Sequence, residues 1–230
     1  MIFNVITLFP EFFTSPLSTG LLGKAVENGI IQARMVDLRE FSQDRFRRCD
    51  DYPYGGGSGM VLQAPVILRA LDSLGDAVTL YPTPGGKVLD QDLVKKLSAE
   101  KEITLICGHY EGIDQRVIDT AVDMEISVGD YVLSGGEFAA LVIIDAVARY
   151  VPGFMSNKES LEDESFEKNL LEYPQYTRPP EVKGLSVPDI LTGGDHGSIL
   201  KWRQEKRIEK TRRVRPDLYR KYILNTIRGE

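Results

Sequence analysis

Three glycine-rich segments contain the residue types with which a protein holds a small molecule. They are residues 82–86 (PTPGG), 108–112 (GHYEG) and 128–136 (VGDYVLSGG), and each follows an apolar run typical of a β-strand. Glycine lets backbone N–H and C=O groups approach a ligand closely. Glycine after a strand also makes ordinary turns. A pocket at the ends of consecutive strands and a set of simple turns therefore both remain open.

A fourth cluster, residues 50–60 (DDYPYGGGSGM), combines two tyrosines with four glycines. It follows Arg45, Arg47 and Arg48. Basic side chains, aromatic rings and mobile glycines suit contact with RNA or phosphate. The same composition is typical of a solvated surface loop, so both interpretations stay open.

Other chemistries lack the residues they need. His109 and His196 have no cysteine or histidine nearby at metal-ligand spacing, so we expect no zinc site and assign no metal ligand. The sequence contains neither G-x-x-x-x-G-K-[ST] nor G-x-S-x-G, and its first strand–helix junction lacks G-x-G-x-x-G. These absences argue against a phosphate-cradling loop, a hydrolase nucleophile elbow and a dinucleotide-binding fold.

The elements that must position these segments alternate along the first 150 residues. The sequence predicts strands at 2–8, 30–38, 77–81, 103–107 and 124–128, and helices at 64–74, 90–99, 113–121 and 137–150. The third strand is expected to end at Pro82, and Asp90 is expected to cap the helix that follows. Such alternation predicts an α/β domain with a mostly parallel sheet.

The predicted helix 137–150 is unusually apolar. Eleven of its fourteen residues are apolar or aromatic, and the polar residues Glu137, Asp145 and Arg149 share one sector. One sheet face cannot cover so wide an apolar surface. Either further helices enclose it or a second subunit does, and we favour a homodimer interface.

Composition sets the broad class. The 230 residues carry a net charge of −6 and are 42% hydrophobic, which is ordinary for a globular chain. The longest apolar run, residues 138–144, is too short to span a membrane, and the N-terminus does not resemble a secretory signal. Two cysteines cannot build a disulfide framework. We therefore expect a cytoplasmic protein without a membrane partner.

The charge is distributed unevenly. Residues 201–230 contain 11 basic and 4 acidic residues, a net charge of +7, which leaves −13 on residues 1–200. This tail is predicted to form helices at 199–213 and 216–227, and a local positive face can bind phosphates on an acidic protein. The proline-rich, acidic stretch 152–181 before it is typical of a linker.

Read together, these segments resemble the bacterial tRNA (guanine-N1)-methyltransferase family of the SPOUT superfamily. The resemblance rests on YGGGSGM, YEGIDQR and GDYVLSGGE, which occur in this order, and on shorter strings including Trp202-Arg203 and Arg215-Pro216-Asp217-Leu218. It extends over nearly the whole chain. Any one string would be weak, but their ordered combination is highly specific.

The resemblance implies an architecture that periodicity could not predict. It implies a parallel-sheet SPOUT domain that binds S-adenosylmethionine and has a C-terminal trefoil knot over residues 1–155. Residues 156–181 would be a flexible interdomain linker carrying the catalytic base, and residues 182–230 a small helical tRNA-binding domain. The family is an obligate homodimer with active sites at the subunit interface. Its reaction transfers a methyl group to N1 of the guanosine immediately 3′ of the anticodon.

The resemblance places the family's donor-binding residues on the glycine-rich segments. The residues implied to bind S-adenosylmethionine are Pro84, Gly85, Gly86, Tyr110, Glu111, Gly112, Val128, Gly129, Tyr131, Leu133, Gly135 and Gly136. The C-terminal residues implied to hold the tRNA backbone are Lys201, Arg203, Lys206, Arg207, Arg212, Arg213 and Arg215.

The resemblance also implies two catalytic residues. The family's base is an aspartate in an Asp-Ser-Phe string, which here reads Glu164-Ser165-Phe166, and its cation corresponds to Arg149. Glutamate has one more methylene than aspartate, and Asp163 is the alternative base if the register shifts by one residue. Mg²⁺ is implied by the family alone, since no carboxylate spacing here requires it.

Two other functions stay open at this point. The chain could be a SPOUT RNA methyltransferase that modifies another atom. Alternatively, it could be a non-catalytic RNA-binding module that keeps the fold without the chemistry.

Overall fold

The computed structural model describes residues 1–155 and 164–228. The chain falls into two compact units, Met1–Ser156 and Asn157–Glu230. We call them the N-terminal unit and the C-terminal unit and describe each by itself.

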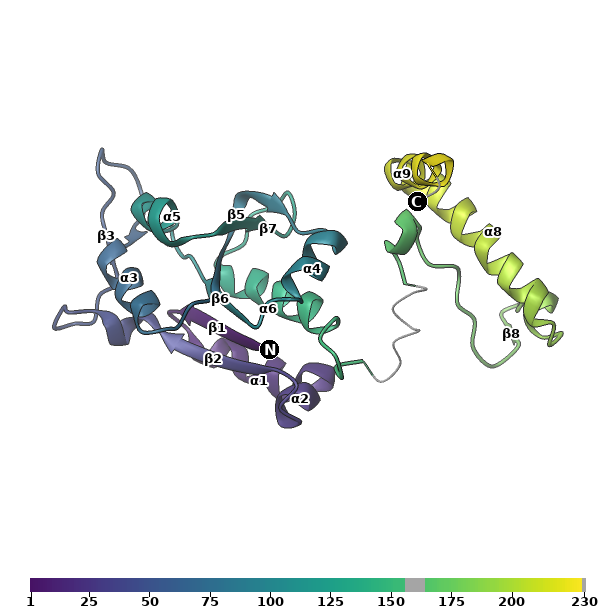
Figure 1. The fold of residues 1–230 in the computed structure, drawn as a ribbon, viewed down its shortest axis with the longest axis horizontal. Helices are drawn as coiled ribbons and strands as arrows, with labels where there is room; N and C mark the ends of the chain where they lie inside the picture. The colour runs from purple at the N-terminus through teal and green to yellow at the C-terminus, as the bar shows by residue number, and fades with distance from the viewer. Residues whose placement is uncertain (156–163, 229–230) are drawn as a thin grey trace. The chain divides into compact units, whose positions relative to one another are not determined.

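A five-stranded parallel sheet forms the centre of the N-terminal unit. Its strands are β1 (Ile2–Thr7), β2 (Gln32–Asp37), β5 (Val78–Val88), β6 (Glu102–Ile106) and β7 (Met124–Ser127). They lie in the order β2-β1-β6-β5-β7, and every neighbouring pair is parallel (Figure 1). The prediction of an α/β domain with a parallel sheet is confirmed.

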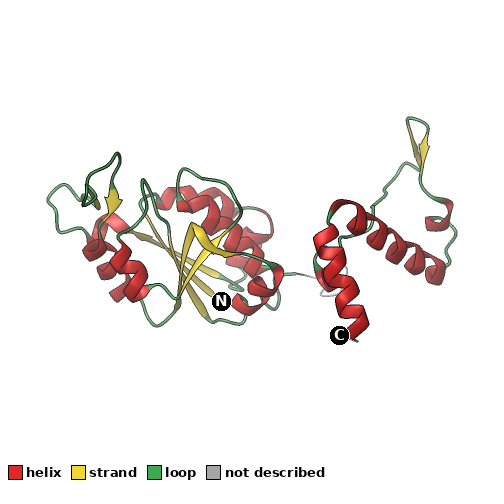
Figure 2. Ribbon diagram, turned by 90° about the horizontal axis from the view of Figure 1, so that it is seen from above, coloured by secondary structure: helices red, strands yellow, loops and turns green. Residues whose placement is uncertain are grey.

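Helices cover both faces of this sheet (Figure 2). One core joins the sheet to α1 (Thr14–Ser18), α2 (Gly20–Glu27), α4 (Gln91–Leu97) and α6 (Gly136–Ala148). The other joins it to α3 (Ala64–Asp72) and α5 (Gln115–Ala121). Along β1, Phe3 and Val5 enter the first core and Ile6 enters the second, because successive side chains of a strand point to opposite faces.

Strand β5 differs from its prediction. Pro82 was expected to end it, but the strand continues to Val88. Both Pro82 and Lys87 pair with Ile126 of β7, so the residues between them bulge out of the ladder. The proline and glycine residues therefore interrupt the pairing, and the strand resumes beyond them. Asp90 caps α4 as predicted, since its carboxylate accepts a hydrogen bond from the backbone N of Leu93 at 2.9 Å.

Two long helices dominate the C-terminal unit. They are α8 (His196–Val214) and α9 (Pro216–Arg228), and a small hairpin of β8 (Glu181–Val182) and β9 (Leu185–Ser186) precedes them. Helix α8 begins before its predicted start because the carboxylate of Asp195 accepts hydrogen bonds from the backbone N of Gly197 and Ser198. Among residues 1–155 and 164–228, no helix combines the length and hydropathy needed to cross a bilayer.

Candidate active site

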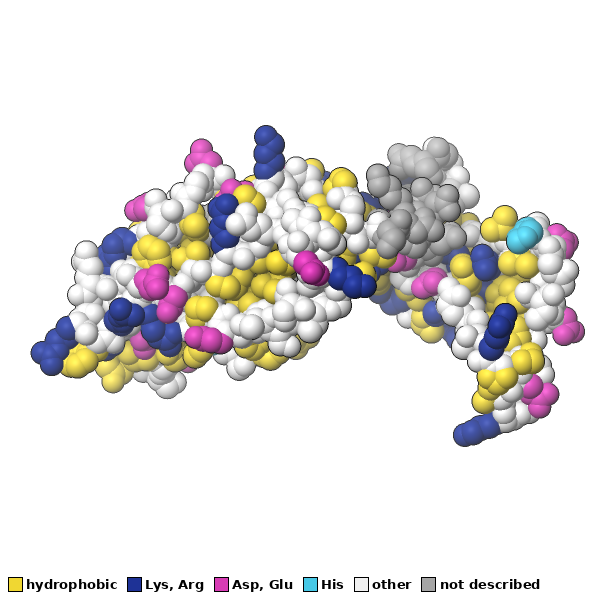
Figure 3. Space-filling model, turned by 90° about the horizontal axis from the view of Figure 1, so that it is seen from below, with side chains coloured by type: hydrophobic (Ala, Val, Ile, Leu, Met, Phe, Trp, Pro, Cys, Tyr) yellow, Lys and Arg dark blue, Asp and Glu magenta, His cyan; other side chains and the backbone are white. Residues whose placement is uncertain are grey.

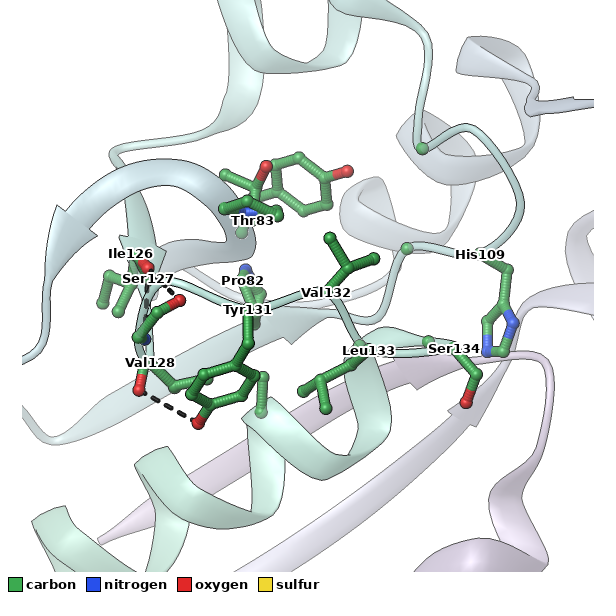
Figure 4. Close-up of a pocket in the computed structure, with 18 of the residues that line it drawn as sticks. Pro82, Thr83, His109, Ile126, Ser127, Val128, Tyr131, Val132, Leu133 and Ser134 are labelled. Atoms are coloured by element: carbon green, nitrogen blue, oxygen red, sulfur yellow. Dashed lines mark hydrogen bonds between the residues drawn. The ribbon is translucent and has the colours of Figure 1, made fainter.

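A pocket of about 240 Å³ opens at the bulge of β5 and the carboxyl ends of β6 and β7. These strands are neighbours in the sheet, so the segments that follow them converge at one edge. The bulge of β5, the loop after β6 and the loop from β7 to α6 form its walls. Figure 4 shows Thr83 across the pocket from Tyr131 and Leu133. The three glycine-rich segments therefore build one pocket rather than separate turns.

Ten of the twelve residues predicted to bind a methyl donor line this pocket. They are Pro84, Tyr110, Glu111, Gly112, Val128, Gly129, Tyr131, Leu133, Gly135 and Gly136. Gly85 and Gly86 do not line it. Gly86 lies directly against the backbone of Glu125 and Ile126 on β7, where a side chain would collide, whereas a Cβ on Gly85 would meet nothing within 4 Å.

The pocket also includes ten residues that are not among the twelve implied donor-binding residues. They are Tyr81, Pro82, Thr83, Gly108, His109, Ile126, Ser127, Val132, Ser134 and Ala139. Six of them belong to the three segments themselves, and Tyr81, Ile126, Ser127 and Ala139 lie one to three positions outside a segment. Tyr81 pairs with Glu125 of β7, one position before the last paired residue ahead of the bulge, and burial raises the pKa of its phenol.

Close backbone contact explains several of the glycines. Gly112 and Gly129 adopt φ values of 114° and 146°, which residues with a side chain rarely adopt. Gly136, at the start of α6, donates its N–H to the carbonyl oxygen of Gly108 at 2.9 Å, and a Cβ there would press on the backbone of Cys107. The beginning of α6 is thereby held against the end of β6.

A buried hydrogen-bond network supports the same corner of the pocket. Glu137 is 3% exposed, and its carboxylate lies 2.7 Å from Nε2 of His109 and accepts the hydroxyl of Thr7 at 2.7 Å. Glu137, one of the three polar residues that share a sector of the predicted helix 137–150, is therefore buried. Its carboxylate oxygens are satisfied in the interior by Thr7 and His109, two residues that are distant from it in the sequence.

The pocket has a weakly acidic lining. Glu111 is the only carboxylate among its lining residues, and none of them is Lys or Arg. The thiol of Cys107 lies behind the loop after β6, and burial raises its pKa well above the ordinary value, so it stays uncharged. A ligand carrying one positive charge suits these surroundings.

The tyrosine- and glycine-rich segment 50–60 connects to this site through its end. The carbonyl oxygen of Met60 accepts the backbone N–H of Glu111 at 3.0 Å, and Gly59 packs against the Glu111 side chain. Strands β3 (Asp50–Asp51) and β4 (Val61–Leu62) pair at its base. Tyr52 and Tyr54 are exposed, so their rings are available to a partner.

The two predicted catalytic residues lie in different units. Arg149 directly follows the last turn of α6 and is half-buried. Glu164 begins the described part of the C-terminal unit, and its carbonyl oxygen accepts a hydrogen bond from the guanidinium of Arg207 at 3.4 Å. The alternative base, Asp163, lies outside the described residues.

Arg207 differs from its predicted role. It is 6% exposed, so it does not present its charge to a phosphate backbone as expected. Its own carbonyl accepts the hydroxyl of Thr211, which in turn accepts the backbone N–H of Leu171 at 2.8 Å. Arg207 and Thr211 therefore hold the segment after Glu164 against α8, a role that no sequence motif indicated.

An α/β unit with a glycine-containing pocket at one edge of its parallel sheet belongs to the class of open-sheet proteins whose ligand crevice lies beyond the strand ends. Comparison with known proteins narrows this class. The model of the tRNA (Guanine-1)-methyltransferase TrmD family matches residues 1–221. This match includes all three pocket segments, all of α8 and the first six residues of α9.

Several curated relatives agree with this match, and each is called tRNA (guanine-N(1)-)-methyltransferase. The Rhodospirillum rubrum protein is 51% identical over 95% of this chain and 92% of its own length. The Treponema denticola protein is 54% identical over 96% and 91%, and the Ruminiclostridium cellulolyticum protein 44% identical over 96% and 97%. The chain belongs to the tRNA (guanine-1)-methyltransferase family, and the resemblance seen in its motifs is confirmed.

Proposed function

We propose that this chain transfers the methyl group of S-adenosylmethionine to N1 of the guanosine immediately 3′ of the anticodon in tRNA. The observation that carries the proposal is the coincidence of a full-length family match with a pocket formed by the implied donor-binding residues. A methyl group on a sulfonium is already activated for attack. The protein must therefore align donor and acceptor and remove a proton.

The proposed donor site is the pocket at the ends of β5, β6 and β7. Its glycines bring backbone N–H and C=O groups close to the ligand, and Glu111 supplies one negative charge toward a sulfonium. Tyr131 is held in place because its hydroxyl donates to the carbonyl oxygen of Val128 at 3.1 Å (Figure 4). These features support binding of a cationic nucleoside by shape more than by charge.

The proposed base is Glu164. N1 of guanine carries a proton at neutral pH, and the Glu164 carboxylate removes it as the N1 lone pair forms the new bond to carbon. The carbon–sulfur bond breaks with its electrons remaining on sulfur, which leaves neutral S-adenosylhomocysteine. Arg149 stabilises the negative charge that develops on O6. Asp163 remains the alternative base.

The SPOUT trefoil knot, confined to residues 1–155, is part of the same proposal. Gly86 against β7 and Gly136 against the end of β6 support it, because both let chain segments cross at backbone distance. We also assign residues 156–181 to an interdomain linker carrying the base and residues 182–230 to tRNA binding. Described residues 164–172 of that linker pack on α8 through Thr211 and Lys210.

We further propose a homodimer with active sites at its interface. Phe138 and Val142 on α6 are 52% and 49% exposed, and the Phe138 ring meets Phe12 edge-on. Figure 3 shows hydrophobic side chains gathered on one face of the N-terminal unit.

We expect Phe138→Glu to shift the mass measured by light scattering from dimer to monomer. Exposed Val182 lies in the other unit, and Val182→Glu should leave a dimer. A dimeric Phe138→Glu protein would contradict this interface.

The tRNA backbone is assigned to exposed cations of α8, among them Lys201, Arg212 and Arg213. The guanidinium of Arg215 instead pairs with Asp217 at 2.7 Å.

Because its proposed substrate is tRNA, we propose that the protein acts in the cytoplasm. No three His, Cys, Asp or Glu residues in the described ranges gather as metal ligands, and Mg²⁺ is proposed from the family alone.

Methyl transfer to a defined transcript tests this function. The chain is incubated with S-adenosylmethionine and an unmodified tRNA that has guanosine 3′ of its anticodon, and the nucleosides are identified by mass spectrometry. We expect N1-methylguanosine at that position, and none when adenosine replaces it. A methyl group on another atom would favour a different SPOUT reaction, and no transfer would favour a binding module.

A further inference from the structure

A second cavity, of about 620 Å³, lies within the C-terminal unit. Its walls come from segment 173–180, from the turn around Leu191 and from the first half of α8. The volume is within the range of about 300–1,000 Å³ that is typical of small-molecule sites. All of its lining residues belong to this one unit, and none of them belongs to the donor pocket.

Flat aromatic and guanidinium surfaces line this cavity. The rings of Trp202 and Tyr176 are 6.4 Å apart, and the guanidinium of Arg203 lies over the ring of Tyr173 at 4.7 Å. Tyr176 is 49% exposed although it is beside this apolar wall. Aromatic rings and arginine planes are the surfaces on which unstacked nucleobases bind.

One polar group at the cavity lacks a partner. Nε of Arg203 is buried and has no hydrogen-bond acceptor among the residues that the structure describes. An unsatisfied buried donor is costly, and an acceptor supplied by a ligand would satisfy it. Gln175, Thr177 and Thr192 add exposed polar side chains around the aromatic wall, and these can read the edge of a base.

The surroundings favour RNA as the source of that ligand. Residues 201–230 carry a net charge of +7, and Arg178 lines the cavity itself. On the C-terminal unit, Lys and Arg side chains adjoin hydrophobic ones (Figure 3). An apolar peptide would leave these cations without a counter-charge, whereas a nucleotide brings a phosphate together with a flat base.

We propose that this cavity receives one unstacked nucleobase of the tRNA, distinct from the guanosine that is methylated. The proposal rests on the tRNA substrate proposed above. The methylated base must reach the donor pocket of the N-terminal unit, whereas a base in this cavity is enclosed by the C-terminal unit alone. The cavity thus fixes the RNA by a second base while the first reacts.

Trp202 is the only tryptophan of the chain, so its fluorescence reports on this cavity. The full chain is titrated with an end-labelled anticodon stem–loop RNA, with binding followed by anisotropy of the label and stacking by Trp202 emission. We expect quenching that saturates with binding. Abasic substitution at one loop position other than the methylated guanosine should abolish the quenching and weaken binding about 10- to 100-fold.

Matched variants distinguish a loss of base stacking from a loss of the folded structure. Trp202→Ala should weaken RNA binding by a similar factor at low and high salt, because stacking, unlike a phosphate contact, releases few counterions. Trp202→Phe, which keeps a ring, should bind nearly as tightly as the wild type. The control Leu200→Ala alters an exposed side chain of the same helix that does not line the cavity, and should have no effect.

The possible failures are distinguishable. RNA that binds by anisotropy without quenching Trp202 would overturn this inference and leave the tRNA substrate intact. Quenching lost only when the methylated guanosine is made abasic would also overturn it, because the cavity would then hold the reacting base. RNA that does not bind would refute the proposed function together with this inference.

Discussion

The cavities of the two units differ in the residues that line them. In the N-terminal unit, five of the twenty lining residues are glycine, none is Lys or Arg, and Glu111 is the only carboxylate among them. In the C-terminal unit, three aromatic rings and two arginines form the wall, on a strongly basic segment. A glycine-lined wall selects a ligand by close fit, while rings and cations hold a polyanion through stacking and charge. If the two cavities bind the proposed ligands, the donor and the RNA are recognised through different interactions.

The largest expected effect concerns the proposed base. Glu164→Gln removes the proposed base, so single-turnover methylation should fall by about 10²- to 10⁴-fold while donor and tRNA affinities stay unchanged. Glu167→Gln, a nearby acidic position, is the matched control and should retain activity. Asp163→Asn tests the alternative base. Normal turnover by Glu164→Gln would remove this residue from the mechanism.

The next largest expected effect is the different influence of salt on the affinities for the two ligands. Raising monovalent salt from 50 to 200 mM should weaken tRNA binding on the order of 100-fold if about four phosphates are contacted. Binding of S-adenosylhomocysteine should change less than about twofold, because its pocket lacks a cationic lining. Filter binding and calorimetry measure the two affinities. Equal salt dependence would break the distinction between the units.

A smaller effect is expected from one methyl group in the β5 bulge. Gly86→Ala places a Cβ against the β7 backbone and should cost about 1–3 kcal/mol in stability, with weaker donor binding. Gly85→Ala is the adjacent control, since a Cβ there meets nothing within 4 Å. Thermal unfolding and calorimetry provide the measurements. Identical behaviour of the two variants would refute the close crossing at Gly86.

Much of the N-terminal unit could be predicted because its signals are local. The apolar alternation of β1, the Asp90 cap and the glycine segments after β6 and β7 all depend on neighbouring residues. Long-range pairing was not predictable in this way. The extension of β5 depends on a double pairing with Ile126, and the burial of Glu137 depends on Thr7, 130 positions away.

The C-terminal unit was harder to predict for the same reason. Its basic character and two helices follow from composition and periodicity, but segment 173–180 has no periodic pattern. The cavity exists because that segment packs beside Trp202 and Arg203. Likewise, Arg207 counts as a cation in the sequence, and only its burial beneath the Glu164 segment reveals a structural role.

Hydrogen exchange of the full chain, read by mass spectrometry with and without S-adenosylhomocysteine, tests most directly where the methyl donor binds. We predict that this ligand alone slows exchange in residues 83–86, 108–112 and 129–136 and leaves residues 173–203 unchanged. The anticodon stem–loop should protect residues 173–203. Donor-induced protection that is absent from the three loops, or that falls on residues 173–203 instead, would contradict this assignment of the two cavities.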